Sequence, residues 1–181
     1  MIGLVILGDG FEIGEMTIPC DYLFRAGIKT IKASAMDTLL VKSQDGVKIE
    51  ADIYLKDVFL DDYDFLFIPG GKATFTTLKN RKDIDDVILH FASLNKWIFS
   101  ICAAPSLIGR LGLLKGLDFT CFPGFEREII GGNHVLNNVV ISKNYITAKS
   151  VYYAEEFALN IINALKGKDM MHKVYNEVRG L

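Results

Sequence analysis

The sequence has no excess of charge of one sign and no apolar run of membrane length. Its 20 Lys and Arg residues are matched by 22 Asp and Glu residues, which gives a formal net charge of -2. Without a positive field, the chain has nothing to attract nucleic acid. The longest apolar runs, such as Ile2–Leu7, fall far short of the ~20 residues that span a bilayer. We therefore expect neither a nucleic-acid partner nor a membrane.

Cysteine and histidine are scarce as well. Three cysteines, an odd number without a CxxC pair, argue against a disulfide framework and for a location in the reducing cytoplasm. The three histidines have no partner at metal-ligand spacing, so we expect no metal site. The glycines after the first apolar run do not complete a dinucleotide fingerprint, because Ile13 stands where GxGxxG needs glycine. We therefore expect no cofactor.

The sequence does contain a large apolar fraction, arranged in alternating segments. Half of its 181 residues are hydrophobic, which excludes a disordered chain and is enough for one domain spanning residues 1–181. Continuous apolar runs at 2–7, 64–68 and 97–101 are typical of strands buried on both faces. Further strands are expected at 30–35, 135–142 and 145–148, a hairpin at 38–50, and helices at 15–26, 83–94, 104–111 and 154–166. Pro19 implies a late start or a kink in the first of these helices.

This order of elements predicts the fold class. Strands that alternate with helices form α/β proteins with a mainly parallel sheet. We expect a doubly wound, three-layer sandwich with helices on both faces of the central sheet. The hairpin is expected to add an antiparallel edge to that sheet.

Cys102 is the most informative single residue. It lies between a buried strand and a short helix that has Pro105 at its start, with the small residues Ala103 and Ala104 between. Such a strand-to-helix turn resembles a nucleophile elbow, where free N–H groups lower the pKa of a thiol from its usual ~8.5. The alternative is that Cys102 is only a small buried hydrophobic residue.

Several segments together resemble the DJ-1/PfpI superfamily, nearest to its DJ-1 and ThiJ/YajL-like branch. They occur in the family's order and span nearly the whole chain. The segments are Leu4–Leu7, Glu15–Pro19, Arg25–Lys29, Ile68–Gly71, Ile101–Pro105, Cys121–Gly124 and Phe157–Leu159. The resemblance implies a flavodoxin-like version of the predicted sandwich.

The resemblance also implies roles for individual residues. Cys102 matches the family's reactive, easily oxidised cysteine, and Glu15 matches the glutamate that binds that sulfur in its protonated form. Gly70, Gly71 and Ala103 match the backbone groups of an oxyanion-type pocket. A carboxyl and a thiol that share one proton titrate as a coupled pair. Without the resemblance, Glu15 would be interpreted as a solvated acid in the first turn of a helix.

The chain departs from the family at positions that matter for chemistry. Peptidase-like members have His directly after the cysteine, where this chain has Ala103. Many DJ-1 relatives have His before the proline of a later loop, where this chain has Phe122. No Cys–His dyad is therefore expected, which counts against peptide hydrolysis. Five candidate pocket residues remain, namely Phe122, Pro123, Tyr152, Tyr153 and His134.

Simpler interpretations stay open for three of these. Tyr152 and Tyr153 can pack the turn before the last long helix instead of narrowing a pocket. His134 can be an ordinary surface histidine.

The helix at 15–26 carries more apolar residues than one buried stripe requires, and DJ-1 relatives pair through the corresponding helix. We therefore expect a homodimer through this helix, unless the chain's own elements cover it.

Two functions from different classes agree with these features. In the first, Cys102 and Glu15 act on a small carbonyl substrate, in a cofactor-independent reaction of the glyoxalase or deglycase type that converts methylglyoxal to lactate. In the second, Cys102 is oxidised to a sulfinate in a redox-sensing stress response, without turnover. An amidase or peptidase is a distant third.

Overall fold

The computed structural model describes residues 1–181. Its centre is a seven-stranded sheet in which every neighbouring pair of strands is parallel except one. The exception is the pair at one edge, formed by Val139–Ser142 and Tyr145–Ala148, which is antiparallel. In spatial order the strands are β10 (Val139–Ser142), β11 (Tyr145–Ala148), β7 (Trp97–Ile101), β6 (Phe65–Ile68), β1 (Ile2–Leu7), β2 (Lys29–Ser34) and β5 (Ile53–Tyr54).

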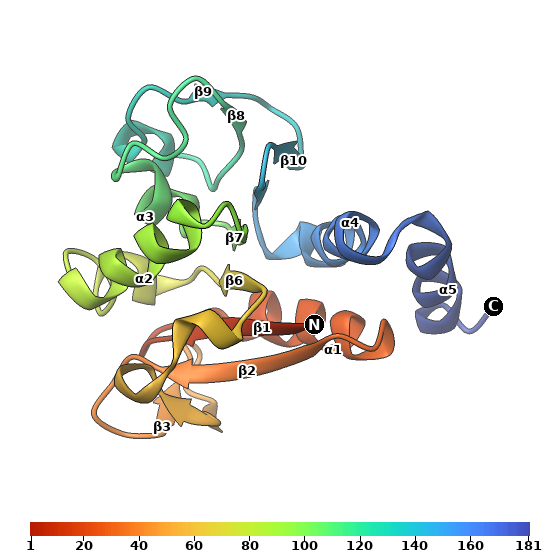
Figure 1. The fold of residues 1–181 in the computed structure, drawn as a ribbon, viewed down its shortest axis with the longest axis horizontal. Coiled ribbons are helices and arrows are strands. Elements are labelled where there is room, and N and C mark those ends of the chain that lie inside the picture. The colour runs from red at the N-terminus through yellow and green to blue at the C-terminus, as the bar shows by residue number, and fades with distance from the viewer.

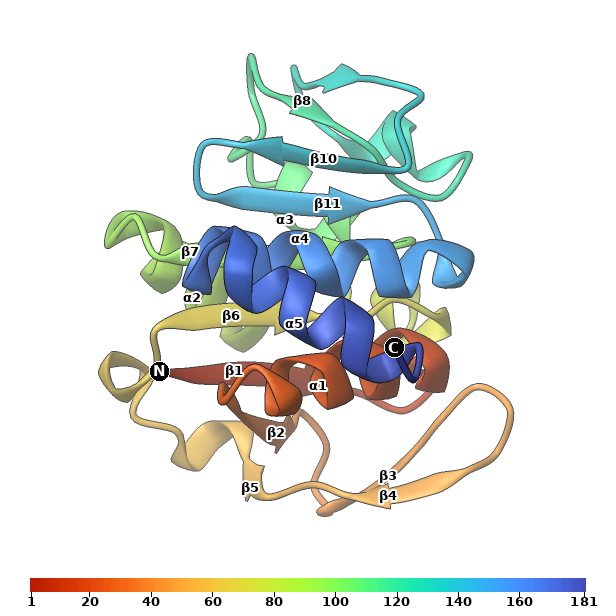
Figure 2. The same ribbon diagram turned by 90° about the vertical axis from the view of Figure 1, so that its right-hand side faces the viewer.

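Helices cover both faces of this sheet. Figure 1 views the sheet along its edge, with α2 (Lys82–Ser93) and α3 (Pro105–Gly109) on one side. On the other side lie α1 (Ile13–Arg25), α4 (Ala154–Lys166) and α5 (Lys168–Val178). The same three helices lie in front of the sheet in Figure 2. The predicted doubly wound sandwich is confirmed. None of the helices combines the length and the apolar character needed to cross a bilayer.

The central strands follow from their sequences. The side chains of β6 are all buried, as is nearly every side chain of β1 and β7, because helices cover both faces. Gly3 stands inside β1 because the Phe65 ring occupies the space beside it, where an added Cβ would lie 2.0 Å from a ring carbon. The Phe65 ring packs in turn against Phe99, with 5.1 Å between the ring centres. Continuous apolar runs therefore predicted these strands correctly.

The smaller elements differ from the prediction. The hairpin exists as β3 (Leu40–Lys42) and β4 (Lys48–Glu50), but it forms a separate two-stranded sheet rather than an edge of the central one. Figure 2 shows it projecting below the sheet. The antiparallel edge is supplied by β10, which begins at Val139 and not at Val135. β5, β8 (Asp118–Phe119) and β9 (Asn133–His134) were not predicted.

The first helix begins earlier than expected. It was predicted at residues 15–26, with a late start or a kink caused by Pro19, but α1 runs through Pro19 from Ile13 to Arg25. Glu12 caps its N-terminus by accepting a hydrogen bond from the N–H of Gly14 at 3.4 Å. Glu15 lies in the first turn of α1, as expected. Short 3₁₀ helices occupy Leu55–Asp57, Leu60–Asp62, Lys72–Phe75, Phe125–Glu128 and Val151–Tyr153.

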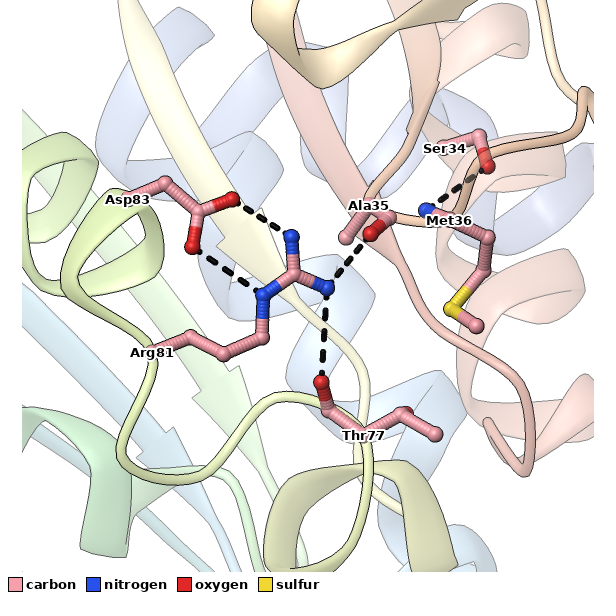
Figure 3. A network of polar contacts seen from close by, with 6 residues as sticks. All are labelled: Ser34, Ala35, Met36, Thr77, Arg81 and Asp83. Carbon is pink, nitrogen blue, oxygen red and sulfur yellow. Dashed lines mark hydrogen bonds and ion pairs between the residues drawn. The ribbon is translucent and has the colours of Figure 1, made fainter.

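An arginine fixes the loop that follows β6. Figure 3 shows the Arg81 guanidinium between the carboxylate of Asp83 and the carbonyl oxygens of Ala35 and Thr77. Thr77 is held from its other side, since its hydroxyl donates to the carbonyl of Asp9 at 2.9 Å. The loop between β6 and α2 is thus tied to the segments that follow β1 and β2.

The strand order determines where a site can form. From β1 the chain goes first to β2 on one side and later to β6 on the other. In sheets of this kind, ligands bind beyond the carboxyl ends of the strands at such a reversal. The ends of β1, β6, β7 and β11 all lie at this edge.

Candidate functional site

A cavity of about 340 Å³ opens at this edge of the sheet. Its lining includes five residues that the sequence analysis named, drawn from α1, the loops after β6 and β7, and the segment before the fourth 3₁₀ helix. They are Glu15, Gly71, Cys102, Ala103 and Phe122. Gly70, which the sequence analysis also named, does not line the cavity but packs against Glu15 and Cys102.

Cys102 has a strained backbone that its neighbours hold in place. Its φ of 64° lies in the left-handed region, which is uncommon for residues other than glycine. Its N–H donates to the carbonyl of Ala148 at 2.8 Å, and its own carbonyl accepts from the N–H of Phe122 at 2.8 Å. The N–H groups of Gly71 and Ala103 are hydrogen bonded to its sulfur. This geometry is that of a nucleophile elbow.

Glu15 is buried beside that sulfur. Only 1% of its surface is exposed, so the alternative of a solvated helix acid is wrong. Its carboxyl is hydrogen bonded to Cys102 and accepts from the N–H of Gly70 at 2.9 Å and from that of Val151. Burial raises the pKa of Glu15 to about 7, against the opposing effect of these hydrogen bonds.

Both glycines of the Pro-Gly-Gly segment are required by close approach. A Cβ on Gly70 would lie 2.5 Å from a carboxylate oxygen of Glu15 and 2.7 Å from the Cβ of Cys102. Gly71 has a φ of 89°, and a Cβ there would lie 2.4 Å from the backbone nitrogen of Glu12. The absence of both side chains lets the N–H of Gly70 reach the carboxyl and that of Gly71 reach the sulfur.

The acidity of the thiol differs from the expectation. We expected the turn to lower the pKa of Cys102, but burial and the neighbouring Glu15 carboxylate raise it, and the N–H groups of Gly71 and Ala103 offset this only in part. Burial also raises the pKa of Cys20 to about 11 and that of Cys121 to about 12. Cys102 and Glu15 are hydrogen bonded and titrate as a pair. The thiolate therefore exists only while Glu15 holds the shared proton.

Four of the five candidate pocket residues do not line the cavity. Pro123 lies next to Phe122 without facing the cavity, and Tyr152, 85% exposed, packs edge-on against Tyr153 at the surface. His134 stacks on the ring of Phe119 with 5.4 Å between ring centres. No histidine therefore lines the cavity, and no group of three or more His, Cys, Asp or Glu side chains is placed to hold a metal ion.

The cavity also contains residues that the sequence analysis missed. Gln44, at the hairpin turn, donates its amide N–H to Glu12 and accepts from the backbone N–H of Lys72 at 3.3 Å. Phe75 and Phe125 form a further part of the wall. Glu12 had a detectable signal, because it precedes Glu15 by one helical turn. Gln44 lies in a turn, and Phe75 and Phe125 lie in short 3₁₀ helices. The contacts of these residues are distant in sequence and leave no local pattern.

Comparisons with known proteins identify the family of the chain and agree with its fold. The model of the DJ-1/PfpI family matches residues 3–164. The chain is similar to Protein dj-1beta of Drosophila melanogaster, at 31% identity over 94% of this chain and 92% of that protein. It is also similar to the Parkinson disease protein 7 homolog of Danio rerio, at 30% identity over 94% and 93%. Among solved structures, oxidized Toxoplasma gondii DJ-1 superimposes with a TM-score of 0.91 at 28% identity, covering 98% of this chain and 97% of that one.

Proposed function

Because the chain belongs to the DJ-1/PfpI family, we propose that it acts on small reactive carbonyls in a glyoxalase- or deglycase-type reaction. The observation that carries this proposal is the buried Glu15 carboxyl, hydrogen bonded to Cys102 and with its pKa raised to about 7. A proton donor and acceptor that titrates near neutral pH next to a thiol is what addition to a carbonyl requires.

The first step joins the thiol to the substrate. The Cys102 sulfur attacks the aldehyde carbon of methylglyoxal, and a C–S bond forms while the C=O π bond breaks. The proton shared by the pair goes to the aldehyde oxygen, which gives a hemithioacetal and leaves Glu15 ionised. The N–H groups of Gly71 and Ala103 are fixed beside the reacting atoms and favour negative charge there.

The second step is an internal redox exchange that needs no external oxidant. Ionised Glu15 takes the proton from the carbon bonded to sulfur and returns it to the neighbouring carbonyl carbon, while the hydroxyl proton of the hemithioacetal passes to the oxygen of that carbonyl. The first carbon is thereby oxidised to a thioester and the second is reduced to an alcohol. Water then adds to the thioester, the C–S bond breaks, and lactic acid leaves while one proton returns to the pair of Glu15 and Cys102.

Lactate formation from methylglyoxal tests this proposal. Cys102→Ser is expected to abolish turnover, and Glu15→Gln to lower it by at least about a hundredfold, because the amide cannot exchange the proton. Cys20→Ser is the matched control, since Cys20 lies outside the cavity. Turnover that survives in Cys102→Ser, or that is lost equally in Cys20→Ser, contradicts the proposal.

A redox role is the second candidate, and the donors around the sulfur support it. The N–H groups of Gly71 and Ala103 and a protonated Glu15 can bind the oxygens of a sulfinate. The T. gondii relative is described as oxidized. Two equivalents of hydrogen peroxide convert a thiolate to a sulfinate and two waters. Intact mass after peroxide treatment is expected to show two added oxygens in the wild type and none in Cys102→Ser.

Peptide hydrolysis has less support, because no histidine lines the cavity to activate the thiol.

We further propose that the protein works in the cytoplasm, where all three cysteines, which are unpaired here, stay reduced. We also propose that two copies pair through α1. The residues that this helix leaves exposed determine which substitution tests the pairing.

A further inference from the structure

One wall of the Cys102 cavity is aromatic. Phe75, Phe122 and Phe125 line it, and 45% of the surface of Phe75 and of Phe122 is exposed. The rings of Phe75 and Phe125 pack together with 5.6 Å between centres and 37° between planes. Apolar rings that stay exposed at a concave site lose nothing by contact with a ligand and gain by burial.

Several groups on the polar side of the cavity are already engaged, whereas the Lys72 and Ser150 side chains also line it and make no hydrogen bond or ion pair within the chain. The side-chain amide of Gln44 is already hydrogen bonded to Glu12 and to the backbone N–H of Lys72. The carboxyl of Glu15 is hydrogen bonded to Cys102 and to the N–H of Gly70. The aromatic wall is the apolar part of the cavity that stays exposed beside these polar groups.

Methylglyoxal is too small to cover the exposed aromatic rings of this wall. Its methyl group would cover little of a cavity of about 340 Å³ once its aldehyde carbon contacts Cys102, and this volume lies in the range that accommodates larger ligands. A flat ring attached to the dicarbonyl group would fill the space beside the paired rings and stack on them.

We infer that this site prefers carbonyl compounds with a planar apolar substituent, of the arylglyoxal class, and that Phe75 and Phe125 determine this preference. The inference rests on the proposed carbonyl chemistry at Cys102 and adds its substrate class. The chemical steps are those given for methylglyoxal, with an aryl group in place of the methyl group.

Paired substrates test the preference. The ratio of kcat/KM for phenylglyoxal to kcat/KM for methylglyoxal is expected to fall about tenfold in Phe75→Ala and in Phe125→Ala. Phe75→Tyr keeps the ring and is expected to retain the ratio. Phe59→Ala is the matched control, because Phe59 is 78% exposed outside this cavity. A ratio that is the same in wild type and both alanine variants overturns the inference.

A second measurement separates this inference from the proposed function. Phenacyl bromide and bromoacetone alkylate a thiol with loss of bromide, and mass spectrometry locates the adduct without any turnover. Each rate is divided by the rate with a free thiol such as N-acetylcysteine, and Cys102→Ser serves as the blank. We expect the wild type to favour phenacyl bromide and both alanine variants to lose that preference.

The two experiments fail in different ways. If neither dicarbonyl is turned over but the alkylation preference is present, the proposed function is wrong and the aromatic selectivity of the pocket stands. If both dicarbonyls are turned over and neither the kcat/KM ratio nor the alkylation ratio depends on Phe75 and Phe125, the proposed function stands and this inference is wrong.

Discussion

Cys102 and Glu15 each hold a position that is unfavourable in isolation. A left-handed backbone at a non-glycine residue costs on the order of 1–3 kcal/mol, and a buried carboxyl loses its hydration. Backbone hydrogen bonds offset both costs. The carbonyl of Ala148 accepts from the N–H of Cys102, and the N–H of Gly70 donates to Glu15. The chain thus spends stability to bring one carboxyl and one thiol into contact.

The raised pKa of Glu15 predicts how stability depends on pH. The pKa is about 7 in the folded chain and 4.5 ordinarily, so between these values the folded state holds a proton that the unfolded state has lost. Stability supplied by this group is fully present below pH 4.5 and falls as the pH rises to about 7. The shift corresponds to about 3 kcal/mol.

Urea unfolding at pH 4.5 and pH 8 measures this loss. Glu15→Gln is the matched control, because its side chain does not titrate in this range. We expect the wild type to lose about 3 kcal/mol more than Glu15→Gln between the two pH values. Equal losses in both proteins would mean that the carboxyl is not buried as the structure describes.

Sequence patterns predicted part of the site at this scale. Cys102 follows directly after an apolar strand, Gly70 comes two residues after another, and Glu15 lies in the first turn of the helix after a third. Local patterns therefore place all three at one edge of the sheet, although the role of Glu15 came from the family resemblance. Gln44 reaches the cavity from a turn and Phe125 from a short 3₁₀ helix, and neither has such a marker. The acidity of Cys102 was predicted in the wrong direction, because a sequence shows the turn but not the carboxylate or the burial around the sulfur.

At the scale of elements, length decided which predictions succeeded. Strands of four or more buried residues and the helix at Ala154–Lys166 were predicted closely, because their apolar period is visible over several residues. β5, β8 and β9 contain two residues each and show no period. Pro19 led us to expect a late start or a kink in α1, although a helix can keep an internal proline where one carbonyl remains without its helical partner.

The loop between β6 and α2 carries Gly70, Gly71 and Phe75, and its stability depends on Arg81. The guanidinium donates to two backbone carbonyls and to Asp83 (Figure 3). Arg81→Ala removes these charged hydrogen bonds, and we expect it to lower the free energy of unfolding by about 1.5–3 kcal/mol. Urea denaturation measures the change.

Lys82→Ala is the control for that substitution. Lys82 forms an exposed ion pair with Asp86 one turn along α2, and such pairs contribute about 0.3–0.5 kcal/mol. Arg81→Ala is therefore expected to cost several times more than Lys82→Ala. Similar small losses in both variants would show that Arg81 does not hold the loop.

At the scale of the whole molecule, the proposed dimer depends on what α1 leaves uncovered. Met16, Tyr22 and Leu23 are buried within the chain, and the Tyr22 side chain lies near Glu155 on α4. Tyr22→Glu would therefore disturb folding rather than pairing alone. Phe24 is 78% exposed on the same helix, which makes it the residue that a second copy would cover.

A two-fold contact through α1 would bring the Phe24 surface of one copy against the equivalent surface of the other. We expect light scattering to give the mass of two chains for the wild type at micromolar concentration and of one chain for Phe24→Glu, because each copy would bury a carboxylate in an apolar contact. Phe59→Glu adds the same charge at an equally exposed phenylalanine away from α1, and this variant is expected to stay dimeric. A wild type with the mass of one chain contradicts the dimer, whereas a dimer that Phe24→Glu leaves intact shows that another face pairs.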